Sequence, residues 1–537
     1  MTRRRPPDRA STFRTGPHRT PAGARVSGNV RRNSHRLLLL SAAAAIAAPV
    51  WGQVWTFEPS ISLQGTATNN VSLAPSDERT SDFVTQISPA LSVSERGDRT
   101  KLEGFVSVPV LLYARTGAEN NYVAPSASLI GDVNFFDKLL YVEGAVSISQ
   151  QFFNPFGAQP VDLASATDNR YRSTVYRVSP YLQGVTTNGI AYGLRNNNVW
   201  ANLSGAPGNA DNSRYTEWFA NMSTPARGQF GLDANYDYTD VTFAGQDQGS
   251  LQTQIGRLVP FWNVDPQLRI GASIGYERND GVLTNYSGTV YGAGLEWRPT
   301  ERTKVVAKWE QRYFGSSYIF TFDHRSRLTV WNFNASRNVT TYPQQLGSLQ
   351  AGTNVPGYLN QLFLSSIPDD IARQQTVDQF MQDRGLPQTL AGPVTLYGDQ
   401  LVLQQQAYAS VGLIGVRNSI FFSAFTVQSE PITAAGTALP PSLFSTNDNT
   451  QIGGSVAWNN RLTQAVNLSA TFTAMRTTAN EPLPGRTDQG YAQITLSAPW
   501  TPRSSGFIAA RYQALSSNVA SDYIEAAVLF GVSYALR

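Results

Sequence analysis

A strict alternation of apolar and polar residues recurs along this 537-residue chain and limits the folds open to it. It is clearest in residues 303–313, where a charged face and an apolar face interleave: Lys304, Lys308, Glu310 and Arg312 against Val305, Ala307, Trp309 and Tyr313. A period of two residues is the period of a β-strand. Two faces of such different polarity favour a strand with lipid on one side and water on the other.

The same alternation fills three other segments, 229–238, 267–277 and 465–475. Each is about as long as a tilted strand must be to cross a bilayer, which is roughly ten residues. A soluble β-sandwich also alternates, but its strands are usually shorter and its apolar faces share one core. The sequence therefore predicts an all-β fold, a transmembrane antiparallel β-barrel of about 22 strands (range 18–22) with one partly helical insert.

The connections between strands carry a second signal. The outward face changes from even to odd positions between Phe322 and Trp331, which predicts a turn at residues 324–327 because an uninterrupted strand keeps its parity. With this turn the strand number is even and both chain ends are periplasmic. Connectors alternate between short and long, as inner turns and outer loops do. Four tryptophans at short turns predict an aromatic girdle: Trp262, Trp297, Trp458 and Trp500.

The first 52 residues differ from the rest in charge. They hold ten of the 42 basic and one of the 38 acidic residues, so the remaining chain has a net charge of −5 and nucleic acid is not an expected partner. Arg31, Arg32 and Arg36 precede a short apolar run, 37–48, that is too short to span a membrane. We predict an Arg-rich disordered segment plus a secretory signal peptide at 1–52, and a barrel at 53–537.

One connector is much longer than the others. Residues 342–399 contain a segment with helical character, 369–384, that ends at Gly385 and Pro387. Connectors of this length are usually functional or disordered. Barrels of about 22 strands enclose a wide lumen that natural proteins plug. Strand-like sequence begins by Trp55, which leaves no N-terminal plug domain of the kind found in nutrient transporters, so we predict that the insert is the plug or cap.

The most distinctive segments of the chain resemble one protein family. Residues 297–331 (WRPTERT…QRYFGSSYIFTFDHRSRLTVW), the following 338–341 with the insert, and 82–93 before a GDR turn resemble an outer-membrane barrel family associated with the PEP-CTERM/exosortase system. The resemblance implies a Gram-negative outer membrane reached by Sec-type export. It further implies a role beside exopolysaccharide export or protein sorting. It supplies no catalytic residue.

Little in the sequence points to catalysis. The chain has no cysteine, and His324 is the only histidine after residue 52, which excludes a zinc site built from several imidazoles. A serine–histidine hydrolase would have to use His324. We predict no enzyme activity and no catalytic, cofactor-binding or metal residue. The candidate site is a polar cluster in the lumen or at its rim: Lys308, Glu310, Arg312, Asp323, His324, Arg325 and Arg327.

The predicted function is a channel or scaffold for surface polysaccharide or protein. The alternatives are an outer-membrane hydrolase and a passive structural or adhesin barrel. The expected partners are outer-membrane lipid, the outer-membrane assembly machinery, which reads C-terminal strands such as 523–537, and exopolysaccharide or its export components.

Overall fold

The computed structural model describes residues 54–137, 139–205, 212–225, 229–243, 250–281, 285–347, 392–394, 401–432, 448–479 and 484–536. The predicted signal segment at 1–52 and the predicted helix at 369–384 lie outside these residues. Among the residues described, no helix has the length and apolarity to cross a membrane.

The described residues form 24 strands in one sheet. The first half of the chain contributes β1 Val54–Thr68, β2 Asp82–Arg96, β3 Thr100–Ser107, β4 Val110–Tyr113, β5 Tyr122–Val123, β6 Ser126–Phe136, β7 Leu140–Phe152, β8 Arg170–Val185, β9 Ala191–Ser204, β10 Ser213–Ser223, β11 Phe230–Phe243 and β12 Leu251–Asn263. The second half contributes β13 Leu268–Asp280, β14 Asn285–Thr300, β15 Thr303–Arg312, β16 Gly315–Arg325, β17 Thr329–Thr340, β18 Val402–Ile414, β19 Asn418–Pro431, β20 Asn449–Arg461, β21 Asn467–Ala479, β22 Arg486–Thr501, β23 Ser504–Ser517 and β24 Tyr523–Ala535. Two short helices, α2 Gly117–Asn120 and α3 Tyr342–Gly347, lie in connectors.

The sheet closes on itself as an antiparallel barrel. The seam pairs β1 with β24 from Ser60 opposite Ala535 to Thr68 opposite Ala527. Strands β3 and β4 both pair with β2 and together fill one position in the wall. Their partners, β6 and β5, together fill the next position. The 24 strand segments therefore make 22 wall positions, and the predicted barrel with about 22 strands is confirmed.

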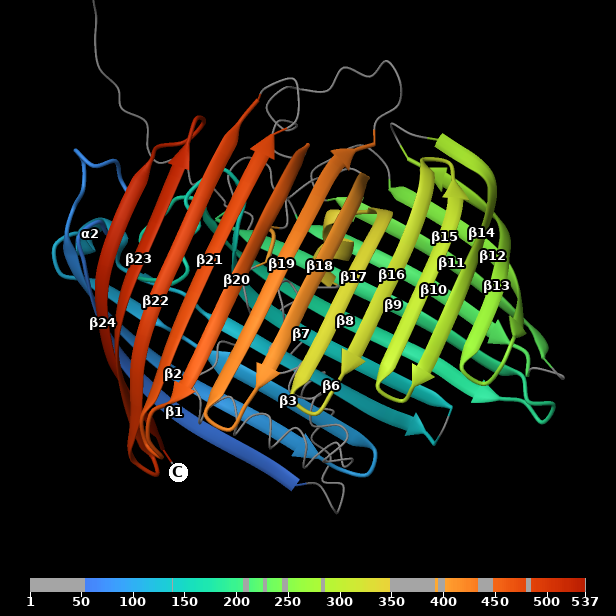
Figure 1. Ribbon diagram of the computed structural model, residues 1–537, viewed down its shortest axis with the longest axis horizontal. Helices are drawn as coiled ribbons and strands as arrows, with labels where there is room; N and C mark the ends of the chain where they lie inside the picture. The colour runs from blue at the N-terminus through green and yellow to red at the C-terminus, as the bar shows by residue number, and fades with distance from the viewer. Residues whose placement is uncertain are drawn as a thin grey trace, which may run out of the picture. The chain divides into compact units, whose positions relative to one another are not determined.

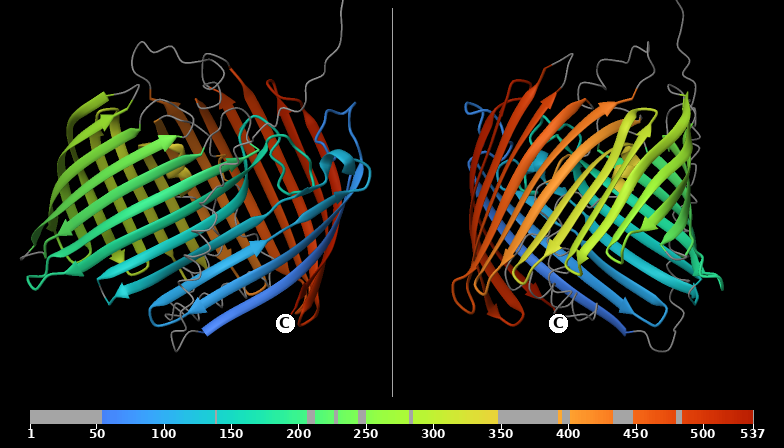
Figure 2. Two further views of the ribbon diagram at one scale, coloured as in Figure 1. Left: turned by 180° about the vertical axis from the view of Figure 1, so that it is seen from behind. Right: turned by 45° about the vertical axis from the view of Figure 1, so that its right-hand side comes forward.

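The two rims of the barrel differ (Figure 1). One rim carries short turns, and the first strand begins and the last strand ends there, as the seam pairing requires. The other rim carries most of the long connectors and α2, and the strands are strongly tilted between the two (Figure 2). The predicted turn exists but lies at 326–328 rather than 324–327, because His324 and Arg325 still pair within β16, and the Ser326 N–H donates to the Thr329 carbonyl at 2.8 Å.

The wall has the two faces that the alternation predicts. Outward positions on β13 and β24 are exposed large apolar residues, such as Ile274, Tyr276 and Phe530. The inward face of β13 is polar or small and that of β24 is mixed, and each carries a buried carboxylate, Glu277 and Glu525. Of the four predicted girdle tryptophans, Trp262, Trp297 and Trp500 are exposed on the outward face near the rim with short turns. Trp458 is partly exposed and donates from its ring N–H to Asn418 Oδ1 at 3.1 Å.

Candidate functional site

The structure separates the seven residues of the predicted polar cluster. Strand pairing puts Lys308, Glu310, Arg312, Asp323 and Arg325 on the inward face of β15 and β16. His324 lies on the opposite, outward face, where its Nδ1 is 2.9 Å from Thr303 Oγ1 and its ring stacks on Phe322. Arg327 is exposed in the turn. The seven residues therefore do not form one site.

Glu310 and Arg312 belong to ion pairs that reach across the inner wall. Arg257 on β12 donates two hydrogen bonds to Glu310 on β15, of 2.9 and 3.0 Å, over the two strands between them. The intervening inward positions are Gly275 and Gly292, so no side chain stands under the ion pair. Arg312 likewise reaches Glu277 on β13, with Nε donating at 2.9 Å. The glycines let long side chains lie flat on the sheet.

Exchanging one of these glycines is a test of this arrangement. A Cβ added to Gly292 would stand 2.1 Å from the Trp309 carbonyl oxygen and 2.9 Å from the Glu310 Cγ, whereas a Cβ on Gly288, on the same strand and face, would meet nothing within 4 Å. We expect Gly292→Ala to lower the free energy of unfolding by about 1–3 kcal/mol, as overpacking does. Gly288→Ala should stay near neutral. Urea unfolding in lipid vesicles measures both, and equal costs would contradict the proposed role of the spacing.

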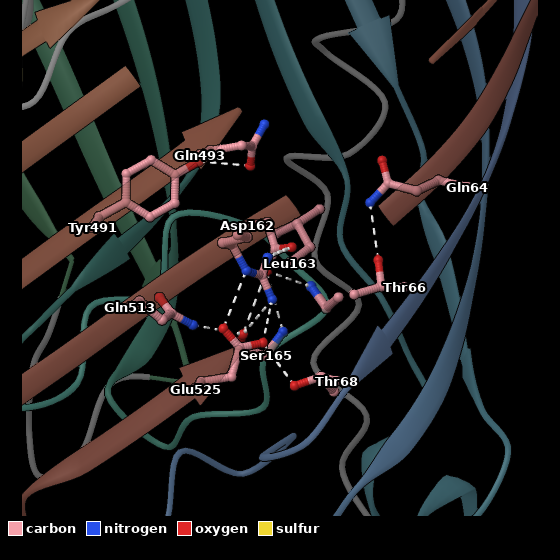
Figure 3. Close-up of polar contacts among 12 residues, drawn as sticks. Gln64, Thr66, Thr68, Asp162, Leu163, Ser165, Tyr491, Gln493, Gln513 and Glu525 are labelled. Atoms are coloured by element: carbon pink, nitrogen blue, oxygen red, sulfur yellow. Dashed lines mark hydrogen bonds and ion pairs between the residues drawn. The ribbon is translucent and has the colours of Figure 1, made fainter. Parts of the chain in front are cut away.

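The most buried charges of the structure hold a connector inside the lumen. Residues 153–169 join β7 to β8, yet their Asp162 carboxylate forms an ion pair with Arg511 on β23. Arg511 also donates to Glu525 on β24, with Nη2 to Oε1 at 2.6 Å. The Arg511 side chain is 1% exposed and that of Glu525 0%. Figure 3 shows Asp162 and Ser165 of the connector beside Glu525 of the wall.

Further hydrogen bonds fasten the same connector to the inner wall. The Thr487 hydroxyl donates to the Phe156 carbonyl at 3.2 Å and the Gln489 amide to the Gln159 carbonyl at 2.8 Å. The Gln513 amide donates to the Ser165 hydroxyl at 3.2 Å. In the strand order, β7 is separated from β24 by β1, β2, β3 and β6. The connector 153–169 therefore crosses part of the lumen.

The start of the predicted insert crosses the lumen in another direction. It leaves β17, but α3 packs against β8, β9 and β10, which lie at least seven strands away in the wall. Tyr342 and Leu346 of α3 are buried in a cluster that includes Val199, Tyr215 and Val241. The Tyr342 and Tyr171 hydroxyls are 2.7 Å apart. This contact anchors the insert inside the barrel.

A later part of the insert is bonded to another region of the wall. The Val394 backbone exchanges two hydrogen bonds with the buried side chain of Gln451 on β20, of 2.9 and 3.1 Å. Both described parts of 342–399, namely 342–347 and 392–394, therefore contact the inner wall. That the insert plugs or caps the lumen stays a prediction, and its predicted helix lies outside the described residues.

A cavity of about 780 Å³ lies between the connector 153–169, residues 392–394 and strands β20–β23. Apolar residues such as Phe152 and Phe507 line part of it, and its β21–β22 side carries hydroxyl and amide side chains: Ser469, Thr471, Thr473, Tyr491, Gln493 and Thr495. The two charged residues that line it are Asp162 and Arg170. Asp162 is paired with Arg511, and Arg170 donates to the Tyr122 hydroxyl at 2.7 Å and to the Asp162 carbonyl. Both charged residues that line the cavity are therefore already engaged.

The placement of His324 bears on the hydrolase alternative. A serine nucleophile needs an imidazole within hydrogen-bond reach. The ring of His324 instead bonds Thr303 on the outward face, while the Ser326 hydroxyl is 2.7 Å from that of Thr329. In the described part of the chain, no group of three or more His, Cys, Asp or Glu residues is arranged to hold a metal ion.

Sequence reasoning missed the residues that hold the two crossing segments. Alternation places Arg511 and Glu525 on the inward face, and a charged pair there is a usable signal. However, Asp162 is 349 residues from Arg511 in sequence, and nothing local indicates that they meet. The same holds for Tyr171 and Tyr342, which are 171 residues apart.

Comparison with known proteins identifies no specific family. No protein-family model and no curated protein matches the sequence, so the resemblance to the PEP-CTERM-associated family gains no support from them. Among solved structures, the FrpB iron transporter from Neisseria meningitidis aligns with a TM-score of 0.45 at 8% identity over 89% of this chain and 82% of that chain. The siderophore receptor PirA from Acinetobacter baumannii aligns with a TM-score of 0.43 at 10% identity over 91% of this chain and 81% of that chain. OccK3 from Pseudomonas aeruginosa aligns with a TM-score of 0.32 at 8% identity over 90% of this chain and 96% of that chain.

The architecture itself identifies the membrane. A closed, even-stranded antiparallel barrel leaves no backbone group unpaired in lipid, and it combines an apolar outer face with a polar lumen. Short turns at the rim where β1 begins and β24 ends complete the pattern of bacterial outer-membrane proteins. The chain is therefore a β-barrel of the Gram-negative outer membrane.

Proposed function

We propose that this barrel is a transport channel for a hydrophilic, uncharged polymer, and that the connector 153–169 and the insert 342–399 set its aperture. The observation that carries the proposal is that the connector and both described parts of the insert are bonded to the inner wall far from the strands they leave. A purely structural or adhesive barrel has no need of a cavity between such segments. The rim that faces the periplasm would be the entrance for an exported molecule.

The lining of the cavity favours a polysaccharide as the cargo over a sorted surface protein. Hydroxyl and amide side chains such as Thr473 and Gln493 can exchange hydrogen bonds with sugar hydroxyls, and the rings of Tyr491 and Phe152 offer apolar faces to sugar rings. An exported protein would bring charged side chains, for which the cavity offers no unengaged partner. The exopolysaccharide and exosortase association implied by the sequence resemblance is compatible with this lining.

Removing the insert tests the proposal. Deleting residues 348–391 should raise the single-channel conductance of the barrel reconstituted in planar bilayers, because the proposal makes this stretch part of the gate. Heat-modifiable migration on a semi-native gel verifies that the variant is a closed barrel. Unchanged conductance in a correctly folded deletion variant would refute the gate.

A point variant gives a finer test of the same gate. Leu346→Ala removes an anchor of α3 without changing the wall, and we expect larger and noisier currents than in the parent protein. Leu413→Ala is the matched control, because Leu413 is an exposed outward residue on β18 and its loss leaves the lumen unchanged. Current records that do not distinguish the two variants would contradict the anchoring role of α3.

A further inference from the structure

The rim with the short turns carries a one-sided set of arginines. Five consecutive turns, from β14–β15 to β22–β23, each have an arginine at the tip or at the strand end: Arg302, Arg327, Arg417, Arg461 and Arg503. We name this set the basic arc. The residues between the strand ends in these turns include one acid, Glu301. In the described part of the chain, none of the five guanidinium groups forms an ion pair.

The opposite half of the same rim is different. Its described turn residues include Asp98, Arg99, Asp137 and Asp265, so acids outnumber the arginine. That arginine is not free, since Arg99 is 3.4 Å from Asp137. Among the described turn residues of the periplasmic rim, the unpaired positive charge is therefore concentrated beside strands β14–β23.

Exposed tryptophans accompany the basic arc. Trp297 precedes the turn that holds Arg302, Trp331 follows the one that holds Arg327, and Trp500 precedes the one that holds Arg503. Strand pairing puts these three indoles on the outward face, and each is at least 44% exposed. Outward tryptophan marks the depth of the lipid head groups. Three of the five arginines, Arg302, Arg327 and Arg503, lie within five residues of these indoles along the chain.

We propose that the basic arc binds the phosphate groups of anionic phospholipids in the inner leaflet, and so gives this side of the barrel a preferred lipid annulus. Guanidinium groups match phosphate geometry and reach head groups on flexible stems. The basic arc lies beside outward tryptophans, which favours lipid as its partner over a soluble acidic protein. Such a protein could contact the turn tips but would not reach indoles at the depth of the lipid head groups. This inference is independent of what the lumen transports.

Lipid competition tests the proposal. Protein purified from membranes and delipidated in detergent is mixed with equimolar phosphatidylglycerol and phosphatidylcholine of identical acyl chains, and bound lipids are counted by native mass spectrometry. We expect bound phosphatidylglycerol to exceed phosphatidylcholine by about fivefold, the order of effect of one basic residue at an anionic surface. Raising the ionic strength about tenfold should bring the ratio toward one, because salt screens exposed charges.

Variants locate the binding. Replacing the five arginines of the basic arc by glutamine should abolish the preference, and Arg417→Gln with Arg503→Gln should reduce it. The matched control is Arg96→Gln with Arg99→Gln, which removes two arginines from the opposite half and should leave the ratio unchanged. Migration on a semi-native gel confirms folding of each variant. Equal binding of the two lipids by the parent protein, or an undiminished ratio in the five-arginine variant, would overturn the proposal.

Discussion

Arg511→Ala is expected to destabilise the barrel by about 3–5 kcal/mol, which is the usual cost of leaving a buried charge without its partner. Glu525 is fully buried, and Arg511 is its ion-pair partner. The Thr68 hydroxyl also donates to Glu525 at 2.7 Å but brings no positive charge. Urea unfolding of the barrel in lipid vesicles measures the loss.

A surface pair on the neighbouring wall provides the control for this change. Arg486 and Asp488 form an exposed ion pair at 2.6 Å on the outward face of β22. Arg486→Ala should cost no more than about 1 kcal/mol, because water already solvates both charges. A loss of similar size in the two variants would mean that burial does not set the worth of the Arg511–Glu525 contact.

The same variant should also affect the lumen. Asp162 loses its ion pair with β23 in Arg511→Ala, so the connector 153–169 is left with hydrogen bonds such as those from Thr487, Gln489, Gln513 and Arg170. We therefore expect a higher single-channel conductance as well as a lower stability. If stability fell while conductance stayed unchanged, Asp162 would not be what holds the connector across the lumen.

The sequence predicted the wall of this barrel well because alternation is a local property. In a strand that separates lipid from water, residues that face lipid alternate with residues that face water, as Tyr276 and Glu277 illustrate on β13. The turn at 326–328 could be predicted for the same reason, since a change of parity has few physical causes. Even the strand number followed from these local patterns.

The contents of the lumen could not be predicted in the same way. Contacts such as Arg511 with Asp162 and Tyr171 with Tyr342 join segments that are far apart in sequence, and a single sequence gives no register for them. His324 shows a related limit: it sits among charged residues in sequence, but one step of strand parity turns it away from Asp323 and Arg325 to the outward face. Residues that are neighbours in sequence therefore lie on opposite faces of β16.

The last expected result concerns the cause of the alternation itself. Phe472 lies in the middle of β21 on the outward face and is 55% exposed in the absence of lipid, while its neighbour Thr471 lines the lumen cavity. Phe472→Arg should cost about 2–4 kcal/mol, because a charge near mid-membrane must leave water. Thr471→Arg should cost far less, because position 471 faces the lumen cavity and not the lipid. The free energies of unfolding of the two variants, measured in the same vesicles, decide the matter: equal costs would mean that the exposed apolar face of β21 does not contact lipid.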